Sequence, residues 1–139
     1  MKIENKYDVI VVGGGIAGVS AAVRAGKEKA KTLLIEHYGF VGGMSTAGMV
    51  SPFMKHQVNG DTLVKGVFQD IENEMRKRNG MIDNGFYANT FRTAAYHLLS
   101  EANCSILFNS EIIKVNRIDN RINSLTVLVE NQKIEIKFK

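Results

Sequence analysis

The sequence predicts an α/β domain that has a parallel sheet and ends in an antiparallel β-meander. A short β-branched run at residues 7–12 stops at three glycines, and apolar residues at helical spacing follow at 16–25. A second apolar run, Thr32–Ile35, completes a strand–helix–strand unit, whose strands pair in parallel through a right-handed crossover. After residue 110 the chain changes to β-rich runs separated by turn-prone pairs, which predict the meander.

The first strand is apolar on both faces, so we expect it to be central in the parallel sheet. Gly26 stands where the first helix would end on a left-handed residue. Residues 38–60 are rich in glycine and show no sustained periodicity, which predicts a long functional loop. A second helix is predicted from Asp61, a good N-cap, to the basic residues 76–78, which suit the negative end of a helix dipole.

A third helix is predicted to begin at Asn89 or Thr90 and to lead into a third short strand at 105–108. In the meander, the last strand alternates cleanly, so one of its faces should meet a core and the other water. The meander strands are expected at residues 111–118, 122–130 and 133–138, with turns at 119–120 and 131–132. The inward face of the third helix is expected to consist of Phe91, Ala94, Ala95, Leu98, Leu99 and Ala102.

Composition limits the classes of protein that fit. With 139 residues, of which 45% are apolar, the chain is long enough for one domain. The net charge of +4 comes from basic residues scattered among 14 acidic ones, so no nucleic-acid partner is expected. No apolar run approaches the roughly 20 residues of a membrane span. Cys104 is the single cysteine and the start has no signal-peptide pattern, so a soluble protein of the reducing cytoplasm is expected.

A glycine fingerprint of the form G-x-G-x-x-G follows the first predicted strand directly and opens the first predicted helix. Gly13 permits a tight turn, Gly15 lets backbone approach a pyrophosphate, and Gly18 lets helix and strand pack closely. The pyrophosphate then lies at the helix N-terminus, where unpaired N–H groups favour negative charge. The predicted phosphate-binding residues are Gly13, Gly15, Ile16, Ala17 and Gly18.

An acidic residue, Glu36, stands at the end of the second predicted strand. Its carboxylate is placed to accept hydrogen bonds from an adenosine ribose, and it would repel a 2′-phosphate, which argues against NADP. His37 follows directly and is expected to cover the adenosine. A Rossmann-like dinucleotide site is predicted from this order of a strand, a glycine turn, a helix, a second strand and an acid. The alternative is a glycine-rich turn of an ordinary α/β protein.

A second glycine pair, Gly42 and Gly43, follows the acid, and this arrangement resembles the FAD-binding domain of the glutathione reductase-like flavoproteins. Within that superfamily, the strings LLIEHYGFVGGMSTAGMVSPFM and FRTAAYHLLSEANCSILFNSEIIKV are similar to the family of FAD-dependent oxidoreductases. The resemblance covers almost the whole chain. It implies an enzyme whose FAD exchanges a hydride or two electrons with a small-molecule substrate, which the sequence does not identify.

The second glycine pair also has a physical interpretation. Gly42 and Gly43 allow another close approach of backbone to the cofactor, and Ser45 and Thr46 offer hydroxyl and N–H groups along its flavin side. The resemblance implies that the backbone of Ile112 faces the adenine edge. An NAD-binding domain without flavin has no need of this second loop. Such a domain is kept as an alternative.

The resemblance implies that such enzymes continue with another parallel strand, which ends in an Ala-Thr-Gly-like motif, and with a substrate domain. We therefore expect residues 1–139 to be a single, truncated FAD-binding domain without its substrate domain. No catalytic acid or base is predicted, because substrate residues lie downstream in this architecture. A second hypothesis is a non-catalytic nucleotide-binding fragment that needs a partner chain to supply the missing C-terminal part.

The remaining candidates are interpreted as structural. His56 could bind an anion or move a proton, but a solvated loop histidine is the favoured interpretation. His97 lies among apolar neighbours of the third helix and is expected to be partly buried and hydrogen-bonded. Cys104 has no second cysteine or metal-ligand spacing nearby, so it is interpreted as packing, and no metal site is predicted.

Overall fold

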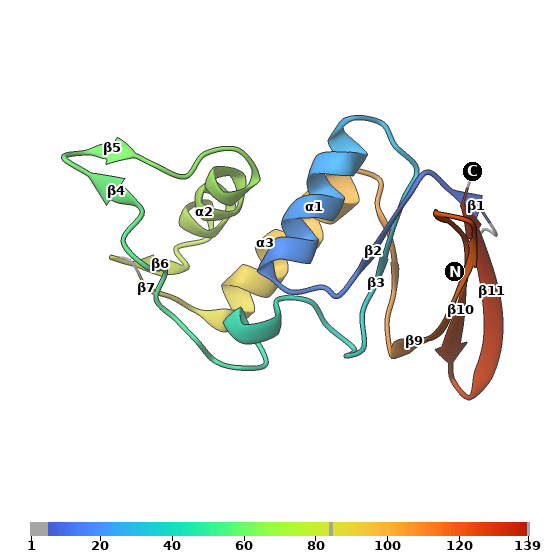
Figure 1. Cartoon of the computed structure of the whole chain (residues 1–139). Helices are drawn as coiled ribbons and strands as arrows, with labels where there is room; N and C mark the ends of the chain where they lie inside the picture. Colours follow the sequence, from blue (N-terminus) through green and yellow to red (C-terminus); the bar gives the residue numbers. More distant parts are fainter. Residues whose placement is uncertain (1–5, 84, 139) are drawn as a thin grey trace.

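The structure, a computed structural model, describes residues 6–83 and 85–138. A three-stranded parallel sheet of β2 (Val9–Val12), β3 (Thr32–Ile35) and β8 (Ser105–Leu107) lies between the helices and a separate, mainly antiparallel sheet (Figure 1). The predicted α/β class with a Rossmann-like parallel sheet is confirmed. The helices are α1 (Ile16–Lys27), α2 (Val67–Lys77) and α3 (Ala88–Glu101), with a short 3₁₀ turn, η1 (Gly43–Ser45).

The central strand of the parallel sheet is β3, not β2. It pairs with β2 on one side and β8 on the other, and all four of its residues are buried. Among the described residues no strand pairs with the outer edge of β2, where Val12 is 60% exposed. The expectation of a central first strand is therefore wrong for the described part of the chain, because an apolar run indicates burial but not which strands flank it.

The two faces of β3 contribute to two different cores. Leu34 packs with the buried residues of the three helices, such as Val19 and Leu99. Leu33 and Ile35 point the other way and pack with residues of the antiparallel sheet. The second core contains Tyr7, Leu33, Ile35, Leu107, Leu125, Val127 and Ile136. The inward face predicted for α3 is confirmed, since all six of its residues are buried.

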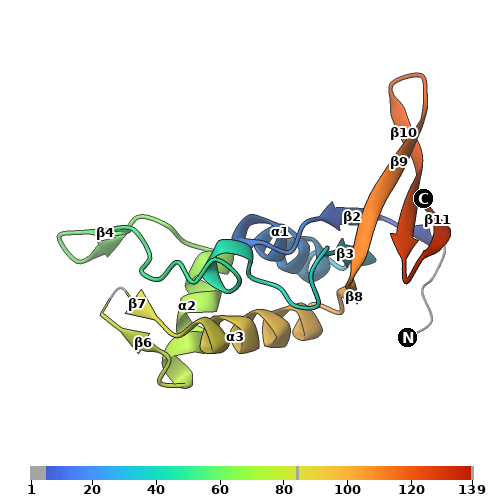
Figure 2. The same ribbon diagram turned by 90° about the horizontal axis from the view of Figure 1, so that it is seen from below.

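The predicted meander is present as β9 (Ser110–Ile118), β10 (Arg121–Val129) and β11 (Gln132–Phe138). The β9–β10 hairpin extends well beyond the parallel sheet (Figure 2). The turn that joins β10 and β11 is centred on Glu130 and Asn131, both with positive φ, one residue before the predicted pair. β11 alternates between buried Ile136 and exposed neighbours, which confirms its predicted two-faced character.

The chain start is shared between the two sheets. Residues of β1 (Lys6–Tyr7) pair in parallel with Lys137 and Phe138 of β11, and β2 begins two residues later in the other sheet. The order of the second sheet is therefore β1-β11-β10-β9. The apolar run at residues 7–12 predicts a single strand, whereas the structure divides these residues between β1 and β2.

The C-terminus of α1 lies later than predicted, because Gly26 is inside the helix and the left-handed residue is Lys29 (φ 64°). Gly26 is required for a different reason. A Cβ there would lie 2.3 Å from the Ala102 carbonyl oxygen, so the glycine allows α1 to approach the end of α3.

The start of α2 was also predicted wrongly. Asp61 belongs to a small hairpin of β4 (Gln57–Val58) and β5 (Asp61–Thr62), and the helix begins six residues after it. Gly66 is its N-cap with φ of 75°, a conformation that favours glycine. A second small hairpin, β6 (Met81–Ile82) and β7 (Gly85–Phe86), follows the helix.

The basic end of α2 is paired with carboxylates of the same helix. Hydrogen bonds from Lys77 and Arg78 hold the pKa of Glu74 at about 2, below its ordinary value of 4.5. A lowered carboxyl pKa adds stability that is complete above pH 4.5 and is lost as the pH falls through about 2.

We expect Glu74→Gln to be less stable than the parent above pH 4.5, with the difference shrinking towards pH 2, as measured by urea unfolding. An undiminished difference at pH 2 would contradict this, and the exposed Glu111→Gln is the matched control.

Candidate dinucleotide site

The first glycine turn is fixed by backbone hydrogen bonds at the carboxyl ends of the parallel strands. Gly13 has φ of 92°, which favours glycine, and its N–H donates to the Ile35 carbonyl oxygen at 2.8 Å. Gly15 is the N-cap of α1, whose first-turn N–H groups have no partner within the helix. The turn therefore presents backbone donors and the positive end of a helix dipole, an arrangement that binds phosphate.

The glycines of the fingerprint differ in what surrounds them. A Cβ on Gly15 would meet no heavy atom within 4 Å, so the space in front of the helix N-terminus is open. A Cβ on Gly18 would lie 1.8 Å from the Gly13 carbonyl oxygen, so only glycine lets the helix lie this close to the turn. This contact agrees with the close packing predicted at Gly18.

The second glycine loop is bonded directly to the first. The Gly42 N–H donates to the Gly14 carbonyl oxygen at 2.7 Å, and Gly42 forms a parallel bridge with Gly15. Gly42 and Gly43 both have positive φ, 118° and 53°. A Cβ on Gly43 would lie 3.0 Å from the Gly15 Cα, so the two backbones are in contact. The two predicted loops thus form one cradle, a contact that no local sequence signal indicates.

The acidic residue predicted to hold a ribose, Glu36, is 7% exposed at the junction of these loops. Its carboxylate accepts hydrogen bonds from the N–H groups of Gly14 and Tyr38. These bonds fix the carboxylate at the rim of the glycine turn, and each oxygen keeps a further lone pair for another donor. Gly14 was not predicted as a site residue, yet its N–H orients this acid.

Glu36 is one of the residues that line a cavity of about 270 Å³. The cavity brings together four residues that the sequence predicted for the cofactor, Gly13, Glu36, His37 and Ile112. The strands β2, β3 and β9 supply its walls, and it has the position expected for the adenosine end of a dinucleotide. The other lining residues are Val12, Ile35, Ser110 and Glu111.

The side chains of Ser45 and Thr46 are turned into the protein, since the two residues are 2% and 8% exposed. The Thr46 hydroxyl donates to the Val41 carbonyl oxygen at 2.9 Å. It therefore stabilises the second glycine loop from within, and the prediction that this hydroxyl is offered along the flavin side is not supported by its position.

His56 is buried, so its interpretation as a solvated loop histidine is wrong. Its Nδ1 lies 3.1 Å from the Met54 carbonyl oxygen, and its Nε2 lies 3.5 Å from a carboxylate oxygen of the buried Glu72. Arg76 donates to the same carboxylate at 2.6 Å. This arrangement attaches the loop that follows the cradle to α2, and sequence reasoning missed Glu72 because the two residues are distant along the chain.

His97 is partly buried, as predicted, but it lies between two acidic side chains, which the sequence pattern did not indicate. His97 has a 40% exposed side chain between Glu74 and Glu101, at 3.6 and 3.4 Å. The Cys104 thiol donates to the Ala22 carbonyl oxygen, and burial raises its pKa. Within residues 6–83 and 85–138 no group of His, Cys, Asp or Glu side chains is arranged to hold a metal ion.

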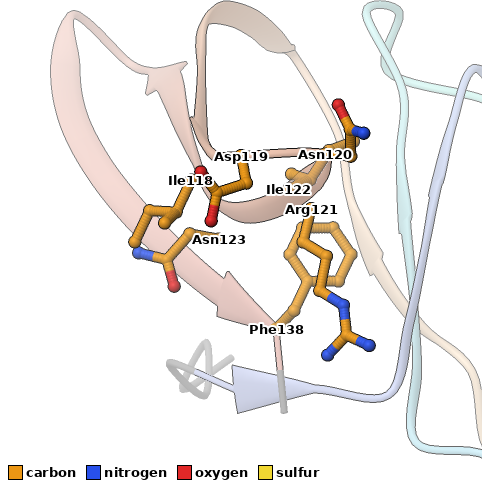
Figure 3. Close-up of a pocket in the computed structure, with 7 residues that line it drawn as sticks. All are labelled: Ile118, Asp119, Asn120, Arg121, Ile122, Asn123 and Phe138. Atoms are coloured by element: carbon orange, nitrogen blue, oxygen red, sulfur yellow. The ribbon is translucent and has the colours of Figure 1, made fainter.

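A larger cavity, of about 480 Å³, lies under the β9–β10 turn (Figure 3). Its walls are Ile118, Asp119, Asn120, Arg121, Ile122, Asn123 and Phe138, drawn as sticks in the figure. None of the glycine-loop residues reaches it. Its lining includes neither a helix N-terminus nor a buried acid, the two features that the glycine loops combine.

A glycine turn at a helix N-terminus, a second glycine loop bonded to it and a buried acid after the next strand define a dinucleotide-binding α/β domain. The family model described as FAD dependent oxidoreductase matches residues 8–138. The chain therefore belongs to the FAD-dependent oxidoreductase family, and its cofactor is FAD. This finding favours FAD over the NAD-only alternative.

Solved structures share the fold at low sequence identity. L-proline dehydrogenase from P. horikoshii superimposes with a TM-score of 0.71 at 14% identity, covering 98% of this chain and 52% of its own. The 3-ketosteroid-delta4-(5alpha)-dehydrogenase from Rhodococcus jostii RHA1 gives 0.70 at 11%, covering 99% and 45%. A geranylgeranyl bacteriochlorophyll reductase-like protein from Thermoplasma acidophilum gives 0.62 at 19%, covering 97% and 38%. The chain thus spans about half or less of the length of these proteins.

Across the described part of the chain, no helix has both the length and the apolar character that crossing a bilayer requires.

Proposed function

We propose that this chain is the FAD-binding part of a flavin-dependent oxidoreductase, whose small-molecule substrate is bound by residues outside it. The observation that carries this proposal is the cradle of two bonded glycine loops, open in front of Gly15 and bordered by the buried Glu36. Residues 1–139 are proposed to form a single, incomplete domain of that enzyme. Cys104 has no cysteine partner, which agrees with the proposed cytoplasmic location.

Each part of the cradle has a proposed task. The turn at Gly13 and Gly15, together with the N–H groups at Ile16 and Ala17, would hold the pyrophosphate at the start of α1. Glu36 would accept hydrogen bonds from the ribose, and His37 and Ile112 would border the adenine in the cavity between β3 and β9. The residues that face the flavin end follow Gly43, where the backbone of Ser45 and Thr46 is held rigid.

FAD, when bound, supplies the two-electron chemistry of such an enzyme. The chain itself contributes binding, orientation and a positive electrostatic field at the helix N-terminus. No described residue is assigned here as a catalytic acid or base.

The test with the widest scope is the visible absorption spectrum of the purified chain, before and after addition of FAD and desalting. Flavin bands retained near one equivalent would support the proposal. A colourless protein after this treatment would contradict it for the isolated chain, while a circular dichroism spectrum with helix and strand content would show that the loss is not caused by unfolding.

Replacing Glu36 by alanine tests the ribose contact. We expect the affinity for FAD to fall about 10- to 100-fold, because one or two charged hydrogen bonds are lost. Quenching of flavin fluorescence measures the dissociation constant. Glu36→Gln keeps one oxygen acceptor and should lose less affinity for FAD than the alanine variant does. If the parent and the alanine variant bound FAD with equal affinity, Glu36 would not belong to the site.

A second candidate is a non-catalytic nucleotide-binding fragment that needs a partner chain. In residues 6–83 and 85–138 no strand pairs with the outer edge of β2, where Val12 is 60% exposed, and this favours the second candidate, since an open edge strand can accept another strand. A monodisperse monomer that melts cooperatively and retains FAD would contradict this candidate. Aggregation of the chain alone, relieved by a co-expressed second polypeptide, would support it.

A further inference from the structure

A second cavity beside the cradle, of about 390 Å³, lies where the second glycine loop meets the start of α3. Thr46 and Met49 come from the loop side, and Tyr87 and Arg92 from the helix side. Of the residues that line this cavity, only Thr46 is predicted from the sequence to have a function. The full lining is Phe40, Thr46, Met49, Tyr87, Ala88, Asn89 and Arg92.

The guanidinium of Arg92 is held on two sides in this cavity. It lies over the Phe40 ring, 5.6 Å from the ring centroid, and it donates to the Asn89 side-chain oxygen at 2.8 Å. That hydrogen bond uses one of five N–H donors, and the side chain is only half-buried. The arginine is therefore oriented while most of its donors remain available to a ligand.

Arg92 also differs from the arginines of the other two helices. Arg24, Arg76 and Arg78, which lie in or directly after those helices, each form an ion pair with a glutamate four residues away. In the described ranges no carboxylate lies within ion-pair distance of Arg92, and the cavity lining contains no acidic residue. A fixed cation without a counter-charge, inside a cavity, favours an anionic ligand, for which the planar guanidinium offers two parallel hydrogen bonds.

The rest of the lining agrees with this charge. Ala88 and Asn89 belong to the first turn of α3, a 14-residue helix whose N-cap residue, Tyr87, makes no side-chain cap bond. First-turn N–H groups add positive potential on the same side as Arg92. Phe40, Met49 and Tyr87 form the apolar and aromatic part of the wall, which suits an apolar group attached to the anion.

We propose that this cavity binds an oxyanion, a carboxylate or a phosphate, through Arg92. The proposal rests on the proposed function, because the wall at Thr46 is the loop assigned to the flavin side of the cofactor. The oxyanion is then either the carboxylate of the enzyme's substrate or a phosphate of FAD itself. Both sources share the recognition chemistry, and experiment separates them.

The first experiment uses the ¹⁵N-labelled 139-residue chain without FAD and follows amide shifts during titration with benzoate, pyrophosphate and the neutral benzyl alcohol. We expect at least one anion to shift the signals of Thr46, Ala88, Asn89 and the Arg92 side chain, and benzyl alcohol to leave them in place. The shifts should disappear in Arg92→Gln and persist in part in Arg92→Lys. If neither anion shifts these signals in the parent chain, the proposal is overturned. This outcome does not depend on whether the variants fold.

The second experiment measures FAD affinity of the parent and of Arg92→Gln by flavin fluorescence. A loss of about 10- to 100-fold, together with shifts by pyrophosphate, assigns the oxyanion to the cofactor. Unchanged FAD affinity, together with benzoate shifts that require Arg92, assigns it to a substrate carboxylate. Anion shifts that persist in Arg92→Gln would overturn the proposal, and Arg117→Gln on the exposed face of β9 is the matched control.

The two proposals fail in different ways. If the parent chain binds no FAD but benzoate still shifts the cavity signals, the cofactor assignment fails and the oxyanion site stands. If the parent binds FAD and neither anion is seen in the cavity, the oxyanion site fails alone.

Discussion

The Gly15→Val chain is expected to fold and to lose saturable FAD binding. The space in front of Gly15 is empty and its φ of −67° suits any L-residue, so the fold tolerates a side chain there. The cost to stability should be about 1 kcal/mol, because valine is a poor N-cap residue. The same side chain would occupy the space where a pyrophosphate meets the helix N-terminus, so binding should disappear.

Equilibrium dialysis with FAD and a urea unfolding curve measure the two effects separately. Ala21→Val, on the exposed part of the same helix, is the matched control and should bind FAD as the parent does. If the Gly15→Val chain bound FAD with the affinity of the parent, the pyrophosphate would lie elsewhere and the proposed cradle would be wrong.

Replacing Gly18 by alanine should cause a large loss of stability, whereas Gly15→Val should mainly affect FAD binding. The new Cβ would lie 1.8 Å from the Gly13 carbonyl oxygen, which is backbone and has no rotamer to change. Either α1 must move away from the sheet or the first glycine turn must open. We expect the free energy of unfolding to fall by roughly 3 kcal/mol, the upper range for overpacking.

Thermal and urea unfolding followed by circular dichroism test this expectation. Gly15→Ala is the matched control in the same turn, with an expected cost of at most about 1 kcal/mol. A Gly18→Ala chain as stable as the parent would show that helix and turn are not in the close contact described here.

The local parts of the fold were predictable because their signals are local. Glycine turns, helical spacing and alternating strands each depend on residues within a few positions of one another. The hairpin before α2 also had a signal, Asn59-Gly60, a pair that favours tight hairpin turns and has positive φ at both residues. The N-cap character of Asp61 predicts a helix start at that residue, which lies six residues before the observed start.

Contacts between distant residues were not predictable in this way. The bond between Gly42 and Gly14, and the burial of His56 against Glu72, depend on how separate elements pack. The edge position of β2 has the same origin, because composition shows that a strand is apolar but not what lies beside it. The sequence thus predicted candidate residues for the site, while their mutual geometry came from the structure.

The pairing of β1 with β11 has a consequence for the order of folding. Tyr7 belongs to the second core, and its strand neighbour is Phe138, so this part of the molecule joins the two ends of the described chain. During synthesis on the ribosome, β1 cannot pair with β11 until Phe138 has emerged. Contacts of such long sequence separation form slowly, so the nucleotide cradle at residues 13–18 and 42–43 can assemble while the meander still lacks its outer strand.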